Sequence, residues 1–227
     1  MGESRISGLE ELLRTRVPNV RLGIHGRPRN PVVPTGVAPL DALLGGGLAG
    51  GDLTELVGDG PVSGSAQVLH AFLRSLARAG RFMALIDGAD SLDIDAEEPA
   101  VLSRLLWVRC RSAAEALKAA DLVLRDRNLP VVVIDLKLNP VAQLRRISGS
   151  VWHRFSRLAE HQGSTVLVIT PLALVGGAAA RVSVSMARPS GAREAIVGPD
   201  AALNGLRFAL LRQESNASEP GAAGRVA

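Results

Sequence analysis

The sequence predicts an α/β fold in which helices cover both faces of a mostly parallel β-sheet. Short apolar runs of strand length alternate along the chain with segments whose apolar residues recur at helical spacing. One run, Val131 to Ile134, is apolar at every position, as expected for a central strand that is buried on both sides. Strands that alternate with helices in this way form a parallel sheet, because each helix crosses a sheet face between two strands.

The composition is that of a globular protein. Of the 227 residues, 47% are hydrophobic and 21% are charged, which supplies enough apolar material for one large core. No apolar run approaches the roughly 20 residues that a membrane-spanning helix needs, and the N-terminus lacks the apolar centre of a signal peptide. We therefore expect a cytoplasmic protein that does not bind membranes.

The cysteine, histidine and charge content indicates neither a metal site nor a strong nucleic-acid surface. The single cysteine, Cys110, cannot form an internal disulfide, and the four histidines are scattered. The net charge of +4 is small for this length, so it permits contact with DNA without indicating it. We expect no metal, and DNA binding that is weak or absent.

The chain divides into three segments. Residues 1–34 form an N-terminal helix and a Pro- and Arg-rich arm, residues 35–212 form the core, and residues 213–227 have the composition of a disordered tail. The helix begins at Ser7, where Ser7 and Glu10 form a capping-box pattern. Its apolar face either covers this protein's own core or docks a partner, and the pattern fits both. That face consists of Leu9, Leu12 and Leu13.

Within the core, strands and helices are expected in alternation. The helix that opens after Gly64 has apolar residues at helical spacing and ends where Gly80 can cap it. The next helix opens on a second capping box, Ser112 with Glu115. The second and third helices span residues 112–125 and 151–161. The strands span residues 53–57, 82–86, 105–109, 131–136, 165–170, 181–187 and 206–211, the last two as an edge meander.

The loop at residues 58–66 lies where an α/β sheet holds phosphate, between a strand and the N-terminus of a helix. A working P-loop has a lysine and then Ser or Thr directly after its second glycine, to neutralise the phosphates and to bind magnesium. Here Ser65 and Ala66 hold those positions, and five residues instead of four separate Gly58 from Gly64. The degenerate loop consists of Gly58, Gly60, Ser63, Gly64, Ser65 and Ala66, and Asp59 adds a negative charge. We therefore expect no bound cofactor.

Two aspartates, Asp87 and Asp135, end predicted strands close to this loop. Asp135 follows the continuous apolar run, where the carboxylate that orients magnesium lies in P-loop enzymes. Without the lysine and the hydroxyl of the loop, we interpret Asp135 as a structural remnant. Lys137 could reach into the cleft and replace the missing cation, but we favour a solvated surface lysine.

Residues 35–93 resemble the start of the RecA recombinase core. The match consists of TGVAPLDALLGGGL, then GDLTELVGDG, then FMALIDGADSLD, in the same order and spacing. The strand VVVIDL and the closing pair ARVSVSMAR and GLRFALLRQ extend it over most of residues 35–213. The resemblance implies a RecA-like core whose central sheet is mostly parallel and whose nucleotide site is degenerate.

Several positions depart from the RecA pattern. The family's glutamate that activates the attacking water corresponds to Ala89. An Asn-Gln pair that senses the γ-phosphate corresponds to Thr170 and Pro171, and the segments that carry the two DNA-binding loops, 138–150 and 172–180, are short. These departures imply that the protein is not an ATPase and has no catalytic residue.

A small RecA-like chain with these losses is similar to the ImuA proteins, bacterial accessory factors encoded with the polymerase-like protein ImuB and an error-prone C-family polymerase. The resemblance implies a non-catalytic adaptor in the SOS response to DNA damage, where translesion synthesis causes mutagenesis. It implies that the protein binds ImuB, a Y-family-like polymerase protein, and RecA, and reaches the C-family polymerase only indirectly. Fold alone does not fix a function, so this expectation rests on RecA order, missing ATP groups and small size together.

Positive charge gathers on one loop and helix that follow the strand ending in Asp135. The set is either a weak patch for DNA or an acidic partner, or a solvated helix face, which we favour because no aromatic ladder accompanies it. Trp152 and Trp107 are expected in the core, with an exposed Trp152 anchor as the alternative. The candidate partner-binding residues here are Arg145, Arg146, Trp152, Arg154 and Arg157.

Three other functions fit the same residues. An ATPase with an unusual loop would take its positive charge from Lys137 or Arg74 and would bind ATP with magnesium. A cell-division inhibitor of the SulA type, which is also RecA-like without a P-loop, would bind a tubulin-like filament protein. A single-stranded DNA binder would lose affinity steeply as salt rises. We rank these three functions below the adaptor.

Overall fold

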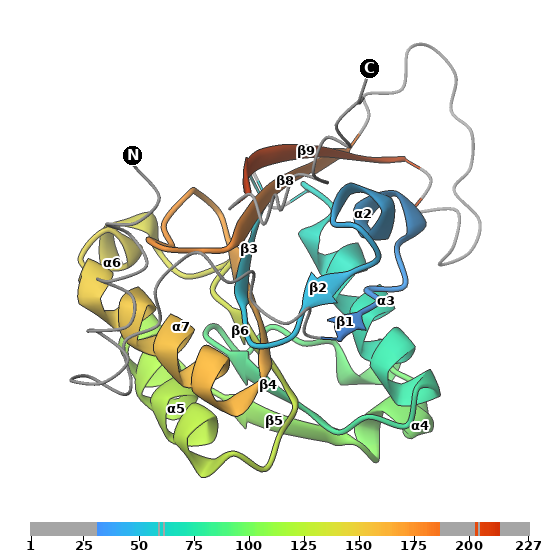
Figure 1. The fold of residues 1–227 in the computed structure, drawn as a ribbon, viewed down its shortest axis with the longest axis horizontal. Helices are drawn as coiled ribbons and strands as arrows, with labels where there is room; N and C mark the ends of the chain where they lie inside the picture. The colour runs from blue at the N-terminus through green and yellow to red at the C-terminus, as the bar shows by residue number, and fades with distance from the viewer. Residues whose placement is uncertain (1–30, 59, 61, 187–202, 204, 214–227) are drawn as a thin grey trace, which may run out of the picture. The chain divides into compact units, whose positions relative to one another are not determined.

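A computed structural model of the chain describes residues 31–58, 60, 62–186, 203 and 205–213 (Figure 1). A seven-stranded sheet runs through these residues in the order β5-β4-β6-β7-β3-β8-β9. Neighbouring strands are parallel except β8 and β9, which are antiparallel. The strands are β3 (Leu53–Gly58), β4 (Met83–Asp87), β5 (Leu105–Arg109), β6 (Val131–Asp135), β7 (Thr165–Thr170), β8 (Ala180–Met186) and β9 (Leu206–Gln213). The predicted parallel sheet is confirmed.

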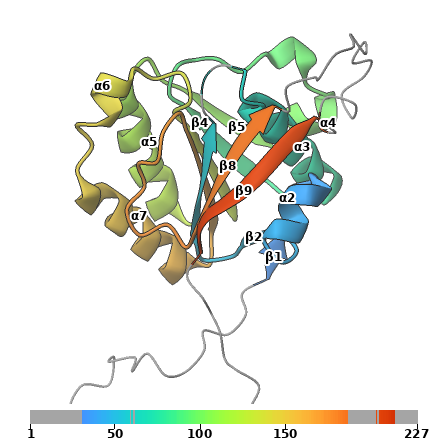
Figure 2. The ribbon, with the colours of Figure 1, turned by 90° about the horizontal axis from the view of Figure 1, so that it is seen from above.

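Helices cover both faces of this sheet, as Figure 2 shows from above. On one face lie α2 (Ala38–Leu43), α3 (Ser65–Arg78) and α4 (Pro99–Leu102). On the other lie α5 (Ala113–Asp126), α6 (Val141–Leu144) and α7 (Gly149–Gln162). Side chains alternate along a strand, so β6 supplies both cores: Val131 and Val133 pack on the α3 side, and Val132 and Ile134 on the α5 and α7 side.

The main helix on the first face, α3, follows the predicted pattern. Its inward side chains recur at helical spacing and are buried, while Arg78 on the outer side is exposed. Gly80 takes the left-handed conformation, with φ +69°, just beyond the end of the helix. The buried side chains of α3 include Val68, Leu69, Phe72, Leu73 and Leu76.

Element boundaries shift by one or two residues from the prediction. Ser112 caps α5 as expected, because its hydroxyl accepts a bond from the N–H of Glu115 at 3.2 Å. The predicted start of the last helix is wrong, because Ser148 is the N-cap of α7. The predicted strand start at Phe82 is also wrong: β4 begins at Met83, and Phe82 is 56% exposed, with the Arg104 guanidinium 5.7 Å from its ring centre.

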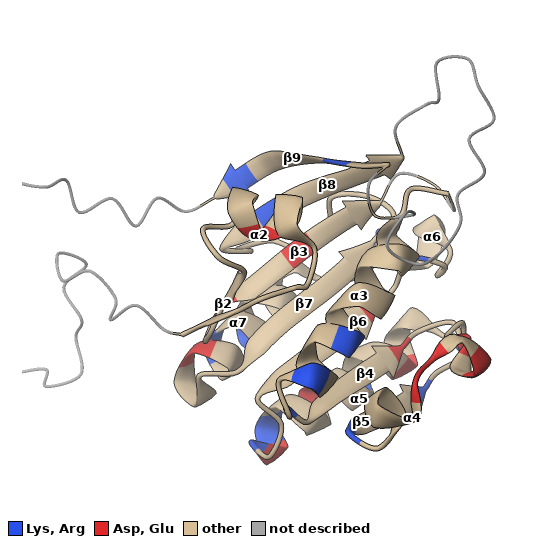
Figure 3. Ribbon diagram, turned by 90° about the vertical axis from the view of Figure 1, so that its right-hand side faces the viewer, with Lys and Arg blue, Asp and Glu red and all other residues tan. Residues whose placement is uncertain are grey.

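Several small features were not predicted, among them the short helices α2 and α6. Inside the predicted arm, β1 (Val32–Val33) pairs antiparallel with β2 (Leu48–Ala49). Gly47 makes this pairing possible, since a Cβ there would lie 2.4 Å from the carbonyl oxygen of Val33. On the α3 face, the segment through η1 (Ile94–Ala96) into α4 carries exposed acids (Figure 3), and His70 of α3 bonds Glu97 within it.

Some predicted features fall outside the described residues. These are the N-terminal helix with Leu9, Leu12 and Leu13, and Ala187 of the predicted strand 181–187. Of the predicted tail 213–227, residues from 214 on lie outside as well, and the start at Gln213 is wrong because Gln213 ends β9. Within the described ranges, every helix is too short or too polar to cross a membrane.

Candidate functional site

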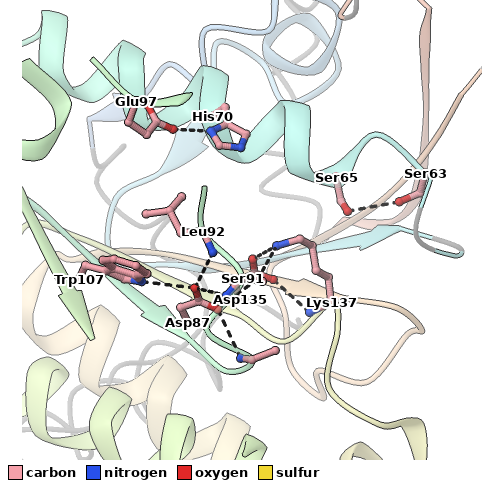
Figure 4. Close-up of polar contacts among 11 residues, drawn as sticks. Ser63, Ser65, His70, Asp87, Ser91, Leu92, Glu97, Trp107, Asp135 and Lys137 are labelled. Carbon is pink, nitrogen blue, oxygen red and sulfur yellow. Dashed lines mark hydrogen bonds and ion pairs between the residues drawn. The ribbon is translucent and has the colours of Figure 1, made fainter. Parts of the chain in front are cut away.

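The residues singled out for nucleotide chemistry lie at the carboxyl ends of the parallel strands. β3 ends at Gly58 and leads into the loop before α3. β4 and β6 are direct neighbours, and Asp87 stands opposite Asp135 in their register. Both carboxylates fall on the α3 side, in phase with Val131 and Val133. The structure therefore brings the loop and the two aspartates together (Figure 4).

Within the loop, short side chains bond to one another. The Ser63 hydroxyl donates to the Ser65 hydroxyl at 3.2 Å, and both residues are buried. Gly58 lies under this pair, because a Cβ there would come within 2.4 Å of Ser63 Oγ. The position that holds the phosphate-binding lysine of a P-loop is therefore held by a buried, internally bonded serine.

An apolar side chain packs against the end of the loop. Gly64 is the N-cap of α3 and has φ +91°. A Cβ at Gly64 would lie 2.1 Å from Cδ2 of Leu206 and 3.4 Å from the sulfur of Met186. Leu206 is buried at the start of β9. The turn from which a P-loop presents its amides thus carries an apolar contact on one side.

Asp87 is fully occupied by its own surroundings. Its carboxylate accepts bonds from the backbone N–H of Ser91 at 2.7 Å and of Leu92 at 2.9 Å. It also accepts from the indole N–H of Trp107 at 3.3 Å. Trp107 packs against the core as predicted, but it is only partly buried, and the Arg109 guanidinium lies 4.8 Å from its ring centre. Asp87 therefore fixes the loop after β4 (Figure 4).

Asp135 is paired with Lys137. The ammonium contacts Oδ2 of Asp135 and donates to the Ser91 hydroxyl at 3.3 Å, while the Lys137 N–H donates to Oδ1 at 3.0 Å. The Lys137 side chain is 14% exposed, so the interpretation of a solvated surface lysine is wrong. Burial raises the pKa of the Asp135 carboxyl, and the ammonium of Lys137 opposes that rise. A cation tethered to the chain thus holds the carboxylate.

These side chains do not fit a magnesium-bound triphosphate. Such a ligand needs a lysine and a hydroxyl after the second glycine and a carboxylate that faces the metal. The chain offers Ser65 and Ala66 after Gly64, and its carboxylate at that place faces Lys137. Ala89 brings no carboxylate to this end of the sheet.

A second cluster, which the sequence analysis missed, lies on the opposite face of the sheet. Glu55 of the central strand β3 has a fully buried side chain and pairs with Arg181, its register partner on β8. Its carboxylate also accepts from the Thr170 hydroxyl at 3.0 Å and from the N–H groups of Leu174 and Val175 at 2.7 and 3.0 Å. The one available signal was an acid inside an apolar strand. This cluster ties the connection after β7 to the middle of the sheet.

Comparison with known proteins finds no protein-family model that matches the chain. RecA of Kineococcus radiotolerans is 31% identical over 170 residues, covering 67% of this chain and 49% of that RecA. The chain is related to RecA. RecA of Leifsonia xyli subsp. xyli is 36% identical over 119 residues, covering 51% of this chain and 33% of that protein. RecA of Mycobacterium tuberculosis is 31% identical over 170 residues, covering 67% of this chain and 21% of that protein.

The chain spans about half the length of the Kineococcus RecA and less of the other two. The relationship and the sheet together confirm the predicted RecA-like core. The narrower resemblance to the ImuA proteins stays a prediction.

The predicted partner-binding residues of the RecA-like core separate into two groups. Trp152 is 1% exposed and packs edge-on against Phe155, so the idea of an exposed Trp152 anchor is wrong. Arg154 bonds Asp121 of α5 at 2.9 Å. Arg154 is nevertheless exposed, as are the other three arginines: Arg145, Arg146 and Arg157.

Proposed function

We propose that this chain is a non-catalytic RecA-like adaptor in SOS-dependent translesion synthesis. It binds a Y-family-like polymerase protein of the ImuB kind, and it binds RecA. The observation that carries the non-catalytic part is the ion pair between Asp135 and Lys137. In a P-loop enzyme the corresponding carboxylate orients a magnesium ion, and here it faces an ammonium of the same chain.

Electrostatics supports this proposal. Two like charges 4 Å apart repel by about 4 kcal/mol at the effective dielectric of a protein surface, and a triphosphate would meet the carboxylate of Asp135 with no lysine at position 65. Pulling Lys137 away to serve the phosphates would leave Asp135 buried without its partner, which costs about 1–3 kcal/mol. Nucleotide binding is therefore unfavourable whether Lys137 stays on Asp135 or moves to the phosphates.

The adaptor part of the proposal rests on the resemblance to the ImuA proteins. It also rests on how the core holds the connections after β6 and β7, where the RecA pattern has its DNA-binding loops. The connection after β6 is short, and Leu144 within it is buried in the core. The connection after β7 is held by the bonds that Leu174 and Val175 donate to Glu55. Segments anchored in this way favour a fixed surface for a protein partner.

The test is capture of named partners. The tagged full chain is expressed in its own bacterium, with and without DNA damage, and RecA and the polymerase-like protein are quantified by mass spectrometry in what remains bound. The adaptor predicts recovery of both, increased by damage. Recovery of a tubulin-like division protein instead would favour the SulA-type inhibitor. Recovery of neither, together with magnesium-dependent ATP binding, would favour the ATPase.

A further inference from the structure

We propose that the segment from Leu138 to Arg146 is a docking surface for an acidic protein segment that also carries apolar side chains. The proposal rests on the adaptor function and specifies the partner sequence that the adaptor recognises. Four exposed side chains make up this surface, which we call the α6 surface: Leu138, Val141, Arg145 and Arg146.

The backbone of the α6 surface is anchored at both ends. The Asn139 side chain is buried and its amide donates to the carbonyl of Gly88 at 2.8 Å. At the other end, Leu144 is buried in the core with α5 and α7. Between these anchors, the N–H of Arg145 donates to the carbonyl of Val141 at 2.9 Å. The four side chains are therefore presented from a fixed backbone, which lowers the entropy lost on binding.

Apolar surface is exposed here at two neighbouring positions. Leu138 is 52% exposed and Val141 is 42% exposed, although the same segment buries Leu144. Val141 and Arg145 are four residues apart along one helical turn, so they share a face. Single exposed aliphatic side chains are common. Here two of them lie beside two consecutive arginines, so the surface has an apolar centre and a charged border. That arrangement is typical of a protein-binding surface.

The stretch of chain that carries this surface has formal charges of one sign only. No Asp or Glu occurs from residue 136 to residue 159. The other two basic side chains that are paired here, Lys137 and Arg154, take their partners from outside this stretch. Arg145 and Arg146 form no ion pair with any described residue. The ribbon of α6 accordingly carries no acidic colour in Figure 3, and an acidic partner is the complementary one.

A protein segment fits this surface better than a nucleic acid does. Single-stranded nucleic acid is held by cations together with exposed aromatic rings on which bases stack. The nearby rings of Trp152 and Phe155 are buried, and the chain has no tyrosine. Leu138 and Val141 offer aliphatic surface, which an apolar side chain of a protein fills.

The experiment measures binding of defined probes to the full chain. Fluorescent peptides of about 20 residues, tiled across the polymerase-like protein and across RecA, are titrated by anisotropy beside a single strand of about 16 nucleotides. R145E/R146E reverses the charge of the surface, and L138S/V141S removes its apolar centre. K118E/R127E makes the same change of charge at two exposed cations on and just after α5 and serves as the control. Thermal unfolding shows that each variant is folded.

If the proposal is right, an acidic peptide binds the unmodified chain. Its affinity falls by at least about tenfold in each surface variant and by less than about twofold in the control. Peptide binding that both surface variants retain would overturn the proposal while leaving the adaptor intact. Loss confined to the DNA probe would assign the surface to nucleic acid and overturn it as well. If neither RecA nor the polymerase-like protein is recovered with the unmodified chain in the capture experiment, the adaptor function itself fails.

Discussion

Two ion pairs with a buried carboxylate, Glu55 with Arg181 and Asp135 with Lys137, differ in the distance along the chain between the two partners. Glu55 collects bonds from β7, β8 and the connection between them, more than 100 residues away in sequence. Asp135 is neutralised by a residue two positions on. The first pair holds distant segments together. The second joins two residues of one short segment, so a buried carboxylate can be neutralised locally, without help from distant strands.

The largest predicted effect is on the Glu55 network. Glu55→Ala leaves Arg181 partly buried without its counter-ion and leaves the N–H groups of Leu174 and Val175 without an acceptor. We expect the free energy of unfolding to fall by about 3–5 kcal/mol, measured by urea denaturation. The double variant E55L/R181M removes both charges and should recover part of that loss. A loss below about 1 kcal/mol in E55A would contradict the structural role of the network.

A smaller loss is expected when Asp135 loses its cation. Lys137→Met should reduce the free energy of unfolding by about 1–3 kcal/mol at neutral pH. The loss is limited because Asp135, at the carboxyl end of β6, can take up a proton instead. Urea denaturation of K137M beside E55A checks the order. If K137M is less stable than E55A, the local pair contributes more to the free energy of unfolding than the Glu55 network does, which contradicts this order.

The pH dependence of K137M sharpens this prediction. Burial already raises the folded-state pKa of Asp135 above its ordinary 3.8, and loss of the ammonium raises it further. The folded chain then binds a proton that the unfolded chain has released, so stability falls as pH rises above 3.8 and through the raised pKa. The difference between K137M and the unmodified chain should be smallest at low pH and grow towards neutrality. A difference independent of pH would show that Asp135 does not titrate.

The smallest effect is expected at an exposed pair. Arg109 bonds both oxygens of Asp90, at 2.6 and 2.7 Å, but the pair lies in solvent. This contact lowers the pKa of Asp90 from 3.8, so its contribution is present above that pH and is lost as pH falls through the lowered value. Asp90→Asn should therefore shift the thermal midpoint less than K137M does at pH 7, and not at all in strong acid. A thermal shift equal to that of K137M would show that the two-bond contact of Arg109 with Asp90 stabilises the fold as much as a buried pair does, which contradicts this prediction.

The sequence predicts the framework of the fold well, because the framework depends on local patterns. The run from Val131 to Ile134, the helical spacing on α3 and the cap at Ser112 each carry their signal within one segment. The site was predicted in part. The losses at Ser65 and Ala66 are visible in a motif, whereas the role of Lys137 depends on β4 lying beside β6, which brings Ser91 to the same ammonium. Glu55 and Arg181 were missed for the same reason, since only the pairing of β3 with β8 places them opposite each other.

The central claim is that Lys137 and the altered loop close the nucleotide site, and calorimetric titration of the full chain with ATP and magnesium tests it most directly. The account predicts no saturable binding up to about 1 mM ATP, with or without magnesium. Saturable, magnesium-dependent binding with a Kd of about 1–10 μM, lost in an Asp135→Asn variant, would show that Asp135 still serves a metal and would contradict the account.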